Sequence, residues 1–133
     1  MTEDGLITIQ SRRSVGDTID ALAEIVTAKG QTVFARIDHS GGAAAAGLRL
    51  RPTQLLIFGN PHAGTPLMQE NQVAGLELPM KALAWEDENG AVWVTYPDVA
   101  WIGARHGLGP GAAAAIAAIG SATAEAVMEA AGR

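Results

Sequence analysis

An aspartate and a histidine stand side by side at the end of a short apolar segment, at Asp38 and His39. A neighbouring carboxylate and imidazole could exchange protons as an acid/base pair. Consecutive side chains of a strand point to opposite faces, so the two could act together only if the strand has already turned at Asp38. The alternative is structural: Asp38 or Ser40 caps a following helix, and His39 packs near the surface.

A glycine-punctuated loop, residues 58–66, follows a strongly apolar segment and contains Asn60, Gly64 and Thr65. A loop of this kind before a helix offers free backbone N–H groups and the positive end of the helix dipole to an anionic or carbonyl-bearing ligand. The loop is not a Walker loop, because no Gly-Lys-Ser/Thr follows, and it is not a dinucleotide fingerprint. The structural alternative is a tight turn in which Thr65 only caps the next helix.

A lysine lies among apolar residues in the segment 78–85. Alternation along a strand places Lys81, Leu83 and Trp85 on one face. A lysine shielded from water gives up its proton more readily and can act as a nucleophile or base. Alternatively, its ammonium group reaches solvent at an edge or forms a salt bridge. The ligand-binding candidates are therefore Asp38, His39, Asn60, Gly64, Thr65, Lys81 and Trp85.

Composition narrows the chemistry further. The chain has no cysteine, which excludes disulfides and thiolate catalysis, and its three histidines show no short ligand spacing, so no metal site is predicted. No sequence signal identifies a cofactor. The net charge is −5 and the nine lysines and arginines are scattered, which argues against a nucleic-acid partner.

The elements that must position these residues alternate between strand and helix and then form a hairpin. Apolar periodicity and turn residues predict strands at 6–11, 32–38, 54–59, 77–87 and 91–96, and helices at 14–29, 41–47, 65–71, 98–106 and 112–131. The order β-α-β-α-β-α-β-β-α-α predicts an α+β fold, a mixed five-stranded sheet with helices packed on it, in a single domain over residues 1–133. Because ligands of parallel β-α-β units bind beyond the strand ends, Asn60 and His39 should share one edge of the sheet.

Two segments bear on location. The N-terminal residues 1–5 are acidic and polar, unlike a signal peptide. Residues 107–124 carry no charge, but they are mostly alanine and glycine, and Gly109-Pro110-Gly111 interrupts them. This composition predicts a loop and an alanine-rich helix rather than a membrane span. We therefore expect a cytoplasmic protein without a membrane partner.

Several stretches together resemble a known family. They are Thr32–His39, Leu50–Pro61, Gly64–Met68 and Leu78–Asp87. In this order they are similar to the bacterial and archaeal domain of unknown function 302, DUF302, over a core from about residue 8 to residue 108, with the alanine-rich helix at about 110–131 beyond it. The resemblance implies a small α+β fold that forms dimers, with recurrent stretches at Ile37–His39, Gly59–Thr65 and Lys81–Trp85. It implies no activity and no cofactor.

Three functions remain open on these patterns. The favoured one is a non-enzymatic module that binds a small ligand or a partner and acts as a homodimer, because no catalytic geometry is recognisable. The alternative is a small cytoplasmic enzyme that uses Lys81, Asp38 or His39 as acid or base, with the Asn60–Thr65 loop as an oxyanion or anion site. The third is a structural or regulatory partner without a pocket.

Overall fold

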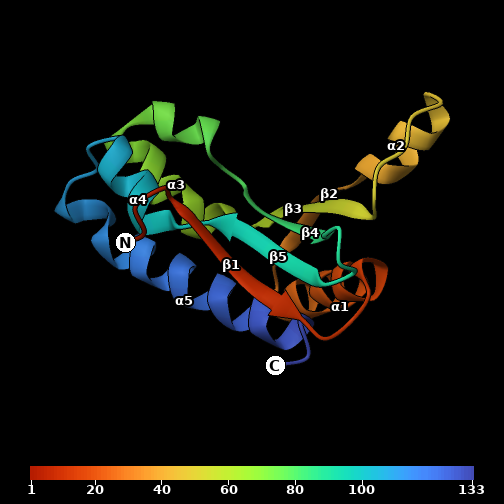
Figure 1. Cartoon of the computed structure of the whole chain (residues 1–133). Helices are drawn as coiled ribbons and strands as arrows, with labels where there is room; N and C mark the ends of the chain where they lie inside the picture. The colour runs from red at the N-terminus through yellow and green to blue at the C-terminus, as the bar shows by residue number, and fades with distance from the viewer.

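Five strands form one sheet in the spatial order β1-β5-β4-β3-β2 (Figure 1). The computed structural model describes all 133 residues. The strands are β1 (Leu6–Ser11), β2 (Thr32–Asp38), β3 (Thr53–Gly59), β4 (Met80–Glu86) and β5 (Val92–Pro97). The predicted α+β class, the five strands and the order of elements are confirmed. All four strand pairings are antiparallel, however, so the sheet is not mixed.

The helices gather on one face and one end of this sheet. They are α1 (Val15–Ala28), α2 (His39–Ala45), α3 (Pro61–Glu70), α4 (Val99–Arg105) and α5 (Ala113–Ala130), with the short 3-10 helices η1 (Gln72–Leu76) and η2 (Pro110–Ala112). The helices α1 and α5 pack against each other, and α1 lies on β2, β3 and β4. In contrast, α2 stands out from the body of the molecule at the far end of β2 and β3 (Figure 1).

Helix α1 anchors the core because its sequence specifies both its start and its apolar stripe. The Ser14 hydroxyl accepts a hydrogen bond from the Asp17 N–H at 3.1 Å, so Ser14 is the N-cap of the helix. Ile19, Leu22 and Val26, spaced at helical intervals, are fully buried. They meet Leu56 and Phe58 of β3, which are fully buried as well.

Helix α5 is used inside this fold. By length and composition, residues Pro110–Ala130 form the one helix that could cross a membrane. Here α5 packs against α1, α3 and α4. It contributes Ile119, Ala126 and Val127 to the core cluster. The helix is therefore one layer of the domain, on the same side of the sheet as α1.

The antiparallel pairing of β2 with β3 separates two segments that we expected to lie together. Thr32 pairs with Gly59 at one end, and Asp38 pairs with Gln54 at the other. Asn60 and His39 therefore sit at opposite ends of the sheet, and the prediction of a shared edge was wrong. The connection through α2 returns the chain directly into the neighbouring strand, which reverses its direction, whereas a parallel pair needs a crossover along the sheet.

Helix α3 begins four residues earlier than predicted. Its N-cap is Asn60, whose side-chain oxygen accepts from the His62 N–H at 2.9 Å, and Pro61 occupies the first turn. Asn60-Pro61 and Thr65-Pro66 are both of the cap-proline type. The first pair starts the helix, and the second falls inside it, so the predicted capping role of Thr65 was wrong.

The sheet is covered on one side only. In β4 and β5, buried residues alternate with half-buried ones: Met80, Ala82 and Ala84 face the helices, as do Val94 and Tyr96. The opposite face carries their neighbours, and no helix packs on it. We call it the open face; its cross-strand rows contain Leu6, Thr8, Gln10, Ile37, Leu55, Ile57, Lys81, Leu83, Trp85, Trp93 and Thr95.

The chain enters β1 through Gly5, which lies against helix α4. Gly5 is buried and has a φ of 75°, in the left-handed region. A Cβ atom there would lie 2.4 Å from the Trp101 ring. The Gly5 carbonyl accepts from the N–H of Asp98, the N-cap of α4. Both the backbone angle and the close ring require glycine at this position.

We expect Gly5→Ala to lower the free energy of unfolding by more than 1 kcal/mol, because left-handed backbone alone costs about that much in a residue with a Cβ atom and the indole must also move. Gly16 in α1 is the matched control, since nothing lies within 4 Å of a Cβ atom there. Gly16→Ala should raise stability by about 0.5–1 kcal/mol. Urea denaturation measures both; equal effects of the two substitutions would contradict this account.

A second pair of substitutions tests the start of α3. Asn60→Ala removes the cap and should cost about 1 kcal/mol of stability. Thr65 is exposed within the helix and its hydroxyl makes no hydrogen bond, so Thr65→Ala should cost nothing measurable. If thermal unfolding showed the larger loss for Thr65→Ala, the start of α3 would be misplaced.

Candidate functional site

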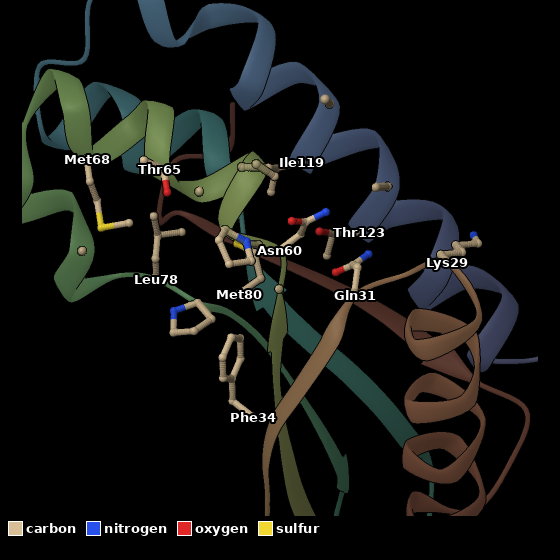
Figure 2. A pocket seen from close by; sticks show the side chains of 18 residues that line it. Lys29, Gln31, Phe34, Asn60, Thr65, Met68, Leu78, Met80, Ile119 and Thr123 are labelled. Carbon is tan, nitrogen blue, oxygen red and sulfur yellow. The ribbon is translucent and has the colours of Figure 1, made fainter.

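A largely apolar cavity lies at the end of β2 and β3 where Asn60 begins α3, between α3 and α5 (Figure 2). Its volume is about 460 Å³, within the range of small-molecule pockets. Its walls are largely apolar, formed by Phe34, Pro61, Ala63, Met68, Leu78, Pro79, Met80, Ala118, Ile119 and Ala122. Of these, Phe34 is 53% exposed, at the mouth of the cavity.

Polar groups reach the cavity from three elements. Asn60 and Thr65 approach from α3, Thr123 from α5, and Gln31 from the turn between α1 and β2, while Lys29 lies at the outer edge with its amine turned away (Figure 2). Asn60 uses its oxygen on the His62 N–H, which leaves its side-chain NH₂ without a partner in the chain. Lys29 forms no salt bridge, so its ammonium group is the one positive charge among the lining residues.

The lining sets limits on chemistry at this cavity. No carboxylate and no imidazole lines it. Proton transfer between an acid and a base therefore has no pair of groups to carry it there. Nor does any group of three or more histidine, aspartate or glutamate side chains come together as a metal site. What the cavity offers is an apolar surface with a rim of hydrogen-bonding groups.

Three of the seven sequence candidates line this cavity: Asn60, Gly64 and Thr65. Asp38 and His39 lie at the opposite end of the sheet. The Asp38 carboxylate caps α2 and accepts from the Ser40 hydroxyl at 2.7 Å and the Gly41 N–H at 2.9 Å. These two hydrogen bonds lower the pKa of Asp38. Asp38 thus fills the structural role weighed for it, while His39 is exposed as the first residue of α2.

Lys81 and Trp85 lie on the open face, away from the cavity. The Lys81 ammonium donates to the Glu77 carbonyl at 3.0 Å, and no carboxylate or imidazole pairs with it. The Trp85 indole donates to the Thr95 hydroxyl at 2.9 Å, and its ring lies 6.4 Å from that of Trp93. The three recurrent segments of the sequence therefore occupy three separate places.

A polar cluster around Glu77 was not predicted from the sequence. Glu77 accepts from His106 at 2.8 Å and pairs with Arg105 at 3.4 Å, while the Asn71 side chain donates to the His106 carbonyl at 3.0 Å. These contacts join the end of α4 to the segment around η1. They connect residues about 30 positions apart, so no local pattern could have signalled them.

Similar proteins among the curated sequences have names that refer to an ion channel. The chain is 48% identical over 130 residues to "Fluoride-specific ion channel FluC 1" of Brucella suis biovar 1 (strain 1330), covering 98% of this chain and 51% of that protein. It is equally identical to "Fluoride-specific ion channel FluC 2" of Brucella melitensis biotype 1, covering 48% of that protein. The chain thus spans about half the length of these relatives.

These names overturn several expectations from the sequence. An ion channel works in a membrane, so the relatives contradict a cytoplasmic location and the absence of a membrane partner. They also contradict a soluble module for a small anionic or carbonyl-bearing ligand, and its alternative, a small cytoplasmic enzyme. The expected homodimer is not contradicted by these names and stays a prediction. Sequence reasoning missed this link because the chain has one segment of membrane-spanning length, the alanine-rich helix, which its composition assigned to a soluble fold.

Fold and family agree. The crystal structure of an uncharacterized DUF302 protein from Bacillus stearothermophilus superposes with a TM-score of 0.82 at 20% identity, covering 96% of this chain and 98% of that one. At that identity the likeness establishes the fold alone. The family match runs over residues 7–126 and so reaches into α5, past residue 108. The chain belongs to the family described as "Domain of unknown function DUF302".

Proposed function

We propose that this chain is the domain of a fluoride-channel assembly that does not form the pore, and that it works beside a channel module in the membrane. One observation carries the proposal: 98% of the chain matches relatives named as fluoride-specific ion channels at 48% identity. The match occupies only about half of each relative. The pore then belongs to the half that the chain does not match.

The geometry of the chain supports the proposal that the pore lies in the other half of the relatives. Its one helix of membrane-spanning length, α5, packs one side against α1, α3 and α4, and 28% of its most apolar stretch is buried within the chain. The cavity also suits a fluoride ion poorly, because its walls are apolar and Lys29 is its single positive charge. Moving a bare ion from water into an apolar medium costs on the order of tens of kcal/mol by simple solvation estimates. We therefore assign fluoride passage to the other half of the assembly.

The proposal is tested by exchange within the Brucella suis relative. The half that aligns with this chain is replaced by the chain itself, and fluoride efflux is measured from proteoliposomes. We expect the exchanged protein to support efflux within about twofold of the intact relative, since the two halves are 48% identical. A form lacking the half should show reduced efflux or reduced assembly in the membrane.

Two controls make the result interpretable. Protein incorporated into the vesicles is quantified, so that a loss of assembly is separated from a loss of conduction. Chloride efflux is measured in parallel to detect vesicles that leak. If the form lacking the half matches the intact relative in efflux, assembly and abundance, the half has no part in the channel and the proposal fails.

A further inference from the structure

The open face is an apolar surface that nothing in the chain covers. One cross-strand row joins Thr8, Thr95, Leu83, Leu55 and Ile37 across all five strands. The next row places Trp93 opposite Trp85. A sheet normally buries both faces or keeps one polar. This one has its helices on the other face and still carries two indoles and several aliphatic side chains.

The indole and hydroxyl groups near the centre of the open face already have hydrogen-bond partners within the chain, whereas the Gln10 side chain in the β1 row has none. Trp85 donates to the Thr95 hydroxyl, which shares a second hydrogen bond with the Thr8 hydroxyl at 2.9 Å. The Trp93 indole donates to Asp87 at 2.8 Å, which lowers the pKa of that carboxyl. Lys81 donates to the Glu77 carbonyl. The indole and hydroxyl donors around Trp85, Trp93 and Thr95 can therefore be buried against an apolar surface without losing a partner, which lowers the penalty for burying this part of the face.

Charge on the face restricts the partner. Lys81 is the one ionisable side chain in its rows, and one carboxylate, that of Asp87, adjoins the face through its hydrogen bond to Trp93. A surface for anionic lipid headgroups needs clustered lysine and arginine, which this face lacks. Paired tryptophans amid aliphatic side chains suit the centre of a protein interface. The fitting partner is an uncharged, apolar protein surface.

We propose that the open face docks against an apolar helix surface of the channel module. This inference rests on the proposed function, and it adds which surface of the domain makes the contact. The relatives supply the occupant, because about half of each lies outside the match and is present in the same polypeptide. A tethered partner is at high effective concentration, so a surface of modest affinity is sufficient.

Site-specific labelling tests the contact, because the chain has no cysteine of its own. Leu83→Cys places one thiol at the centre of the open face. Leu76→Cys is the control, on η1, at a residue that is 77% exposed. Both are compared in the isolated chain and in the exchanged channel protein, with any cysteines of the channel half replaced. We expect maleimide labelling at position 83 to slow at least tenfold in the channel protein, and labelling at position 76 to stay the same.

A variant that disrupts the proposed contact should show the opposite result, a loss of protection. Leu83→Glu should restore fast labelling of Leu55→Cys, its cross-strand neighbour, in the channel protein. Circular dichroism of the isolated Leu83→Glu variant checks that it folds. The Leu83→Cys labelling experiment does not depend on this variant.

Labelling at position 83 that stays fast, in a protein whose efflux depends on the domain, overturns the docking surface and leaves the proposed function intact. Efflux and assembly that do not depend on the domain overturn the proposed function and the surface with it. Protection that appears in the isolated chain as its concentration rises, with a matching doubling of mass by light scattering, assigns the face to a second copy and also overturns the proposal.

Discussion

The helices bury only one face of the antiparallel sheet, and the placement of the other side chains depends on this. The apolar stripe of α1 and the inner face of α5 cover the side of β3, β4 and β5 that carries Leu56, Phe58 and Val94. Because side chains alternate along a strand, burying these residues turns their neighbours outward to the open face. That alternation decides where Lys81, Trp85 and Trp93 lie. It also leaves the cavity at the sheet end, where the two layers separate around the start of α3.

Local signals in the sequence were enough to predict most of the elements. Capping at Ser14 and the periodic apolar residues of α1 depend on residues close together in the chain. The direction of β2 relative to β3, in contrast, does not depend on residues close together in the chain. The connection through α2 contains a short helix, which resembled a crossover in sequence, yet it projects from the body and returns to the next strand. A pairing direction is set by contacts between distant segments, and one sequence does not display them.

In the candidate site, too, sequence reasoning found the residues with a local signature and missed those that distant elements contribute. Asn60, Gly64 and Thr65 were identified because a loop before a helix has a local signature. Phe34, Leu78 and Ile119 reach the same cavity from distant elements, and nothing in their immediate sequence marks them. Asp38 and Lys81 carried reactive groups in suggestive positions, but each satisfies its hydrogen bonds within the backbone around it. Their residue types indicated possible chemistry, but in the structure both side chains hold the backbone in place.

A domain with one apolar sheet face uncovered is suited to work next to another module. Relatives that carry a channel name are about twice as long as this chain. We propose that their other half is this module and that the open face contacts it. The most direct test is the structure of the intact Brucella suis relative in a lipid bilayer, determined by electron cryo-microscopy. Our account predicts that the half matching this chain rests with Leu83, Trp85 and Trp93 against helices of the channel half. A half that has no fixed position, or that meets the channel through α1 and α5, would contradict it.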